Sequence, residues 1–268
     1  MDERTIREKL SRIKCFMLDM DGTFYLGANL LDGSLDFLEM LRETGRTNLF
    51  LTNNSSKSAD VYRQKLARMG VAERYRNVLT SGQAAGSWCL REMPGKKAFL
   101  LGNDMLRAEL EQMGVAIDND RPDYVLIAYD TTLGYAKMTA VCDFVRAGLP
   151  YIATHPDFNC PTETGFAPDI GAIIAFIEAS TGRRPDLIIG KPYGGIVEEA
   201  LKATGLQKDE LAMVGDRLYT DIATGRNFGI LSILVLTGEA TLQDVEASDV
   251  KPDLIFDRLS SMNPYLKG

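Results

Sequence analysis

Short apolar runs alternate along the chain with segments whose apolar residues recur every three or four positions. In the first eighty residues the runs are Cys15–Asp19, Asn48–Thr52 and Val78–Thr80. The intervening segments Ser34–Gly45 and Ser58–Gly70 have helical periodicity, and each ends at a glycine, a common helix stop. This order of strand, helix and strand predicts an α/β protein with a mostly parallel sheet.

The alternation continues to the C-terminus without an internal repeat or a long Pro/Ser linker. Further strands are predicted at Ala98–Leu101, Tyr124–Tyr129, Tyr151–Thr154, Leu187–Ile189, Leu211–Val214, Leu231–Leu236 and Leu254–Phe256. Further helices are predicted at Met105–Gly114, Tyr135–Gly148, Ile170–Ser180, Ile196–Thr204 and Thr220–Phe228. Since composition marks no domain boundary, the boundaries have to come from motifs.

The first strand ends in the sequence Asp19-Met20-Asp21-Gly22-Thr23. Alternation points the side chains of Asp19 and Asp21 the same way if the strand persists, at the carboxyl end of the sheet. Ligands of open α/β sheets bind at that edge. Two carboxylates so close repel each other unless a cation or a shared proton lies between them. The alternative for this motif alone is an acidic loop with an Asp-Gly turn.

Three later strands also end in polar residues. These are Thr52, Asn53 and Asn54 after the second strand, Lys191 after the strand at 187–189, and Asp216 and Asp221 after the strand at 211–214. Each alone is ordinary, because hydroxyls, amides and aspartates often cap helices and a lone lysine is usually solvated. Together they converge on one edge of one sheet. The set offers carboxylates for a hard cation, a lysine and a hydroxyl for phosphate oxygens, and a carboxylate for nucleophilic attack.

With these motifs in this order, the sequence resembles the haloacid dehalogenase superfamily. The four motifs of that family correspond here to Asp19–Thr23, the Thr52 segment, Lys191 and Gly215–Asp221. The spacing resembles the NagD-like and p-nitrophenylphosphatase-like phosphatases, which carry a large cap domain between the second and third motifs. The resemblance implies a Rossmannoid parallel-sheet core with an inserted α/β cap. We expect the core at residues 1–82 and 185–268, the substrate-specificity cap at 83–184, and a flap at Phe24–Asp32.

The resemblance also implies the roles of the core residues. Asp19 would attack the phosphorus and form an aspartyl-phosphate. Asp21 would protonate the leaving group and later take a proton from water. Thr52 and Lys191 would act in catalysis by holding phosphoryl oxygens, and Asn53 and Asn54 complete the expected substrate-binding set.

A hard divalent cation, Mg²⁺, is the implied cofactor. Its expected ligands are the carboxylates of Asp19 and Asp216 and the main-chain carbonyl of Asp21. Asp221 would hold the ion directly or through its waters.

Substrate choice is expected to come from the cap, because the four motifs hold only the phosphate and the metal. The polar turn His155-Pro156-Asp157-Phe158-Asn159 follows a predicted cap strand. We take His155 and Asp157 as candidate ligands for the hydroxyls of a sugar phosphate, a nucleotide or a similar small metabolite. The alternative is a connector whose prolines and aspartates only shape turns.

Other functions fit the sequence less well. A dehalogenase of the same fold also uses an aspartate nucleophile, but the family resemblance implies that the second aspartate, Asp21, marks phosphoryl transfer. Phosphotransfer within the same family is the alternative activity, and a non-catalytic binding protein would usually have lost Asp19, Asp21 or Lys191. The chain has neither GxGxxG after its first strand nor GxxxxGK[ST], so dinucleotide-binding dehydrogenases and P-loop NTPases are excluded.

Composition and charge agree with a small-molecule enzyme. The 268 residues carry a formal net charge of −7, and there is no basic stripe of the kind that binds nucleic acid. No apolar run approaches the roughly 18–20 residues that cross a bilayer, and the charged N-terminal segment does not read as a secretory signal. The four cysteines lack CxxC spacing, which disfavours zinc and redox sites. We expect a cytoplasmic protein without nucleic-acid or membrane partners, and leave a homodimer open.

Overall fold

The computed structural model describes residues 2–162 and 164–267, and the chain divides into two compact units. Unit 1 combines Met1–Thr52, Tyr62–Leu79 and Val197–Gly268, and unit 2 combines Asn53–Val61 and Thr80–Ile196. The main segment of unit 2 thus spans residues 80–196, and the predicted insertion at 83–184 lies within it. Unit 2 also includes the loop that follows the second predicted strand.

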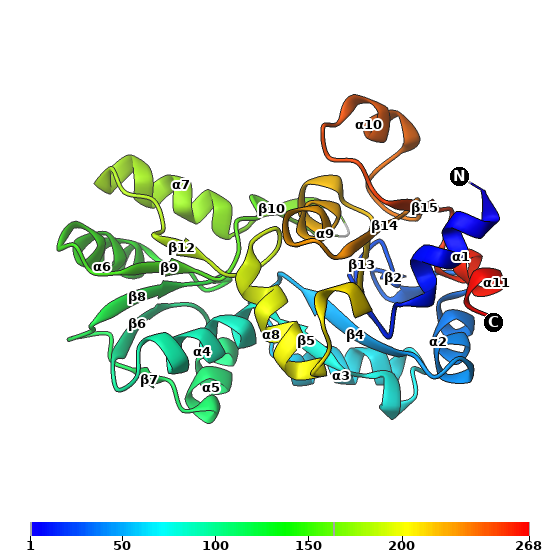
Figure 1. The fold of residues 1–268 in the computed structure, drawn as a ribbon. Helices are drawn as coiled ribbons and strands as arrows, with labels where there is room; N and C mark the ends of the chain where they lie inside the picture. The colour runs from blue at the N-terminus through cyan, green and yellow to red at the C-terminus, as the bar shows by residue number, and fades with distance from the viewer. Residues whose placement is uncertain (1, 163, 268) are drawn as a thin grey trace. The chain divides into compact units, whose positions relative to one another are not determined.

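Unit 1 is built on a six-stranded sheet in the order β15-β14-β13-β1-β4-β5 (Figure 1). β1 pairs in parallel with β13 and β4, and β14 pairs in parallel with β13 and β15. The strands are β1 (Cys15–Leu18), β4 (Thr47–Thr52), β5 (Val78–Thr80), β13 (Leu211–Gly215), β14 (Leu231–Val235) and β15 (Leu254–Phe256). β2 (Tyr25–Leu26) and β3 (Asn29–Leu30) form a separate antiparallel hairpin.

The helices of unit 1 follow the predicted pattern, with additions at both termini. They are α1 (Glu3–Ser11), α2 (Ser34–Glu43), α3 (Ala59–Arg68), α8 (Gly194–Thr204), α9 (Ala223–Phe228), α10 (Leu242–Ala247) and α11 (Asn263–Leu266). Short 3₁₀ turns lie at Glu73–Tyr75, Lys208–Glu210 and Leu259–Met262. The sequence analysis did not predict α1, because this segment is rich in charged residues. α1 lies beside α11, so that the two ends of the chain meet (Figure 1).

The central strands of unit 1 are apolar throughout because both faces of a parallel sheet are covered. Every residue of β1 and β13 is buried. Phe16 of β1 meets Phe37 of α2 edge to face, with ring centroids 5.4 Å apart. Phe50 of β4 meets Phe24 in the same way at 4.7 Å, which ties the segment after the first motif to the core.

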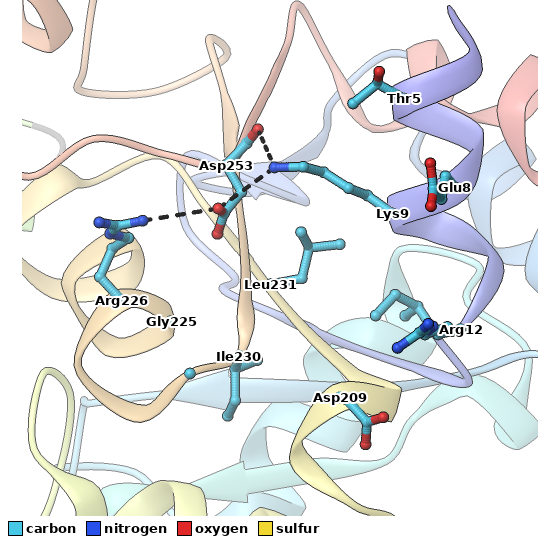
Figure 2. A pocket seen from close by; sticks show the side chains of 12 residues that line it. Thr5, Glu8, Lys9, Arg12, Asp209, Gly225, Arg226, Ile230, Leu231 and Asp253 are labelled. Carbon is cyan, nitrogen blue, oxygen red and sulfur yellow. Dashed lines mark hydrogen bonds and ion pairs between the residues drawn. The ribbon is translucent and has the colours of Figure 1, made fainter.

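Charged residues join α1 to the amino-terminal edge of this sheet around a cavity of about 600 Å³ (Figure 2). Lys9 of α1 reaches Asp253 at 3.6 Å, and Arg226 reaches the same carboxylate at 3.8 Å. The Asp253 carboxylate also accepts hydrogen bonds from the main chain and hydroxyl of Ser232 at the start of β14. Because Ile13 precedes β1 and lines this cavity, the cavity lies at the edge opposite to the predicted motifs.

Unit 2 has its own parallel sheet, in the order β12-β9-β8-β6-β7 (Figure 1). Its strands are β6 (Lys97–Leu101), β7 (Ala116–Ile117), β8 (Tyr124–Ile127), β9 (Tyr151–Ala153) and β12 (Leu187–Ile188), with a hairpin of β10 (Asn159–Thr162) and β11 (Gly165–Pro168). Its helices are α4 (Ser81–Glu92), α5 (Asp104–Met113), α6 (Tyr135–Arg146) and α7 (Ile170–Thr181). Apolar residues of β6 and β8 pack against α6 and α7 in one buried cluster.

The sequence did not predict α4, β7 or the hairpin of β10 and β11, and two tertiary features of unit 2 also differ from the prediction. β12 pairs with β9, so this strand belongs to unit 2 although it lies beyond the predicted end of the insertion at residue 184. The loop after β4 is bonded to unit 2, because Asn103 donates to the Ser56 carbonyl at 2.8 Å and the Ala59 amide donates to Glu109 at 2.9 Å. Both features are tertiary pairings that hydrophobic periodicity does not encode.

In the described part of the chain, the helices are all too short or too polar to span a bilayer.

Candidate active site

Three aspartates of unit 1 converge at the carboxyl edge of its sheet. Asp19 follows β1 and Asp216 follows β13, and these strands are in register, with Leu18 opposite Val214. Asp221 lies on a π-helical turn, Leu218–Ile222. One carboxylate oxygen from each aspartate lies within 4.8 Å of the other two. Among residues 2–162 and 164–267, this is the group of acidic side chains that could hold a metal ion.

The π-helical turn explains how Asp221 reaches the other two carboxylates. The Ile222 amide donates to the Arg217 carbonyl at 3.1 Å, a bond across five residues rather than four. The wider turn brings the Asp221 carboxylate back to the Arg217 amide at 3.2 Å. Such single-turn bulges are frequent at functional sites. The sequence predicted a plain helix from Thr220, and the structure begins α9 only at Ala223.

Two glycines, Gly22 and Gly238, lie against the Asp216 carboxylate, and a side chain at either position would overlap it. A Cβ on Gly22 would lie 2.5 Å from Asp216 Oδ2, and one on Gly238 would lie 2.0 Å from the same oxygen. Gly22 also has a φ of +87°, which favours glycine in its own right. The main chain at Gly22 and at Gly238 therefore approaches this carboxylate too closely for any residue with a Cβ.

The loop after β14 holds Asp216 in place. The Glu239 amide donates to Asp216 Oδ2 at 2.8 Å, and the Thr23 hydroxyl donates to Oδ1 at 3.1 Å. The Ala240 amide donates to the Asp216 carbonyl at 3.0 Å, and the Thr237 hydroxyl donates to the Gly22 carbonyl at 2.7 Å. The segment 237–240 thus joins the first and last motifs.

The electrostatics of the cluster favour a cation. Burial raises the pKa of Asp216 to about 6, and the charge of Asp19 acts in the same direction. Burial alone would lower the pKa of the Arg217 guanidinium, but Asp19 and Asp221 outweigh it and raise that pKa. Arg217 also forms an ion pair with Glu239 at 3.0 Å. One arginine therefore offsets only part of the negative charge of the site.

Asp21 is not a member of this group, and it is solvent-exposed. The protein packed around it raises the pKa of its carboxyl by desolvation, Lys65 opposes this shift, and the charge of Asp19 adds to it. Lys65 itself lies over the Tyr25 ring, 3.7 Å from the centroid. Thr52 is buried at the end of β4, which neighbours β1, so it lies at the same edge as Asp19.

The other predicted substrate-binding residues lie in unit 2. Lys191 and Asn53 are buried and bonded to each other, and Asn53 also bonds to Asp157. The Asn54 side chain is used locally, because its oxygen accepts from the amide and hydroxyl of Ser56 at 2.9 and 2.7 Å.

His155, predicted to contact the substrate, lies inside unit 2. Its side chain is fully buried, and Nε2 lies 3.1 Å from Asp169 Oδ1. Nδ1 lies 3.1 Å from the Thr154 hydroxyl and 3.4 Å from the Ser81 hydroxyl. Both ring nitrogens therefore have partners inside unit 2, and these contacts hold the loop of His155 in place.

Sequence reasoning missed the residues that support the acidic cluster. Thr23, Arg217 and the segment 237–240 bond to its members or to one another. One signal was available for 237–240, because Thr237-Gly238 directly follows a predicted strand and so reaches the same edge as Asp19 and Asp216. No pattern in the sequence indicates the Arg217–Glu239 pair.

Comparisons with known proteins agree with this arrangement. A haloacid dehalogenase-like hydrolase family model matches residues 16–116, and a HAD-hydrolase-like model matches residues 188–262. An acid sugar phosphatase of Staphylococcus aureus (strain MRSA252) is 38% identical over 252 residues, which cover 94% of this chain and 97% of the relative.

Two solved structures are similar over nearly all of this chain. The 4-nitrophenylphosphatase of Thermotoga maritima is 47% identical with a TM-score of 0.93, covering 97% of this chain and 99% of that chain. The glycerol phosphate phosphatase of Mycobacterium tuberculosis in complex with magnesium is 31% identical with a TM-score of 0.87, covering 94% of this chain and 78% of that chain. It is also known in complex with calcium.

The chain therefore belongs to the haloacid dehalogenase-like hydrolases, among the phosphatases of the NagD and 4-nitrophenylphosphatase type. This confirms the family, the fold class and the enzyme class predicted from the four motifs.

The packing around Asp216 generates a prediction for Gly238→Ala. The added methyl group must displace the Asp216 carboxylate, and a misplacement of about 1 Å in an active site can lower the rate about 100-fold. We expect a loss of this order in the hydrolysis of a generic aryl phosphate, with little change in thermal stability. Gly134→Ala is the matched control, because a Cβ there meets nothing within 4 Å. Wild-type activity in Gly238→Ala would show that Asp216 need not stay where it is.

Proposed function

We propose that the protein is a Mg²⁺-dependent phosphomonoesterase that acts on small phosphorylated metabolites through a phosphorylated Asp19. The observation that carries the proposal is the convergence of Asp19, Asp216 and Asp221 at one sheet edge. A phosphomonoester is an anion, so a carboxylate nucleophile can approach it only if the surrounding negative charge is neutralised.

The donor set fits a hard divalent cation. Carboxylate oxygens are the ligands that Mg²⁺ and Ca²⁺ prefer, and the raised pKa of Asp216 reflects a buried, crowded charge that a cation would relieve. Asp19 and Asp216 would hold the ion directly together with the Asp21 carbonyl, and Asp221 directly or through water. The magnesium and calcium complexes of the mycobacterial phosphatase support this assignment. A bound Mg²⁺ would neutralise and orient the phosphoryl group.

The residues of the first motif would carry the two chemical steps. An Asp19 carboxylate oxygen forms a bond to phosphorus while the ester bond to the leaving group breaks, and Asp21 gives that leaving oxygen a proton. Water then attacks the acyl phosphate, Asp21 takes its proton, and inorganic phosphate is released with Asp19 restored. The raised pKa of Asp21 supports the first role, because it keeps more of this carboxyl protonated near neutral pH.

Phosphate binding is proposed for the second and third motifs. The Thr52 hydroxyl and the Lys191 ammonium suit phosphoryl oxygens by their chemistry. The side chains of Asn53 and Asn54 are engaged elsewhere, so we assign these two residues no direct side-chain contact with phosphate.

The substrate class follows from the relatives and from unit 2. The similar proteins are named for sugar phosphates, glycerol phosphate and 4-nitrophenyl phosphate, which share a phosphomonoester on a small polar or aryl group. We propose that unit 2 is the cap and that it discriminates among leaving groups. Cytoplasmic location and oligomeric state stay predictions of the sequence.

Asp19→Asn tests the nucleophile. An amide cannot form the acyl phosphate, so turnover of 4-nitrophenyl phosphate in Mg²⁺ should fall by more than about 1,000-fold while the circular dichroism spectrum stays unchanged. Trapping with ³²P-labelled substrate should label the wild type and leave Asp19→Asn unlabelled. A variant within tenfold of wild-type turnover would refute the assignment.

Asp21→Asn tests the general acid by the leaving group. A nitrophenolate leaves without protonation, whereas the alkoxide of glycerol phosphate needs a proton. We therefore expect kcat to fall about 10-fold more with the alkyl ester than with the aryl ester. Equal losses on both esters would contradict the role of Asp21 as the acid.

The raised pKa of Asp216 predicts how pH and Mg²⁺ act on stability. A carboxyl whose pKa is higher in the folded than in the unfolded state contributes stability below about pH 4 that is lost as the pH rises through about 6. Metal-free protein should therefore gain more in Tm from Mg²⁺ at about pH 7 than at about pH 5. Asp216→Asn, measured by calorimetry in EDTA, should have the higher Tm at about pH 7 and respond weakly to Mg²⁺. A wild-type response to Mg²⁺ in that variant would place the ion elsewhere.

A further inference from the structure

The side chain of Asn53 pairs with the main chain of Lys191 on both sides of that residue. Asn53 Oδ1 accepts from the Lys191 amide at 2.8 Å, and Asn53 Nδ2 donates to the Lys191 carbonyl at 2.9 Å. The carboxamide thus bonds to one residue as a neighbouring strand would. Both residues are buried, with 6% and 2% of their surface exposed.

The orientation of this amide is fixed from the other side by Asp157. Asn53 Nδ2 lies 3.2 and 3.1 Å from the two carboxylate oxygens of Asp157. A carboxylate accepts hydrogen bonds, so it selects the nitrogen and turns the amide oxygen toward the Lys191 amide. The Ser81 hydroxyl donates to the Asn53 carbonyl, which anchors the main chain of Asn53 as well.

The close fit continues at the residue before Lys191. A Cβ on Gly190 would lie 2.6 Å from Asn53 Oδ1 and 2.7 Å from the Thr154 carbonyl. The chain entering Lys191 therefore runs directly against the Asn53 side chain, and only glycine permits that approach.

Direct substrate binding is the competing role for Asn53, and its hydrogen-bond capacity argues against it. A carboxamide has two N–H donors, and here they serve the Lys191 carbonyl and Asp157. A phosphate oxygen would need one of these donors, so binding it would break a buried bond.

We propose that Asn53 is a positioning residue that fixes the main chain of Lys191, and that Asp157 fixes Asn53 in turn. The inference rests on the proposed phosphate-binding role of Lys191. It changes the role predicted for Asp157, which would act on phosphate affinity through Asn53 and Lys191 instead of reading the leaving group.

Asn53→Asp is the sharpest variant, because it keeps the shape and the acceptor for the Lys191 amide. It removes the donor to the Lys191 carbonyl and sets two carboxylates against each other. We expect kcat/KM to fall about 10- to 100-fold and the inhibition constant of inorganic phosphate to rise by a similar factor. The ratio of activities on 4-nitrophenyl and glycerol phosphate should not change. A reordered ratio would overturn the proposal in favour of direct leaving-group contact.

Two further variants distinguish a loss of positioning from a loss of folding. Asp157→Asn keeps an acceptor for Asn53 and should raise the inhibition constant of phosphate about threefold on a fold of wild-type Tm. Combined with Asn53→Asp, it restores a donor opposite residue 53 and should recover part of the loss. Asn77→Asp is the matched control, since Asn77 also donates to main-chain carbonyls but lies in unit 1. An unchanged phosphate constant in Asp157→Asn, without recovery in the double variant, would overturn the role of Asp157.

Lys191→Ala separates this inference from the function on which it rests. If the phosphate constant is unchanged in Lys191→Ala, the role proposed for Lys191 fails, whatever Asn53 does. If it rises in Lys191→Ala but stays at the wild-type value in a folded Asn53→Asp, Lys191 binds phosphate without needing Asn53, and the positioning role is refuted.

Discussion

Mutual repulsion among three carboxylates is the constraint around which the carboxyl edge of unit 1 is organised. Parallel pairing of β1 with β13 brings Asp19 and Asp216 to the same edge, and the turn after β13 adds Asp221. Burial, and after it the charge of Asp19, raise the pKa of Asp216, so folding this arrangement without a counter-charge costs free energy. Arg217 offsets part of it. The remaining negative charge favours a cation at this edge.

Repelling groups stay together only if the surrounding chain leaves them no alternative position. Asp216 accepts hydrogen bonds from Thr23 and from the Glu239 amide, and glycines on two sides close the space into which it would otherwise turn. In unit 2, the Asn53 carboxamide confines Lys191 by the same principle, with main-chain bonds in place of glycine contacts. In both arrangements, uncharged neighbours hold a charged residue in position: glycines and Thr23 around Asp216, and Asn53 beside Lys191.

Most of the fold was predictable from the sequence, because each strand of a covered parallel sheet is a short apolar run. The meeting of Asp19, Thr52 and Asp216 at one edge was predictable for the same reason, because they follow neighbouring strands of one sheet. Lys191 was expected at that edge too, but it follows β12, which belongs to the sheet of unit 2. Other features were not predicted from the apolar pattern, including α4 and the hairpin of β10 and β11. The pairing of β12 with β9 and the attachment of residues 53–61 to unit 2 depend on contacts distant in sequence. The burial of His155 was missed because a polar residue after a strand looks the same whether it faces solvent or Asp169.

In a regular helix, the direction of the Asp221 side chain would fix the directions of all later side chains of α9. The π-helical turn at Leu218–Ile222 separates the two. Upstream of it, the chain must aim Asp221 at the cluster; downstream, α9 must place Thr224 and Gly225 against β14. In an uninterrupted α-helix, one residue more or less would rotate every later side chain by about 100°. The extra residue in the turn absorbs that rotation. The close packing of Gly225 on Ser232 and the direction of Asp221 can therefore both be met in one short segment.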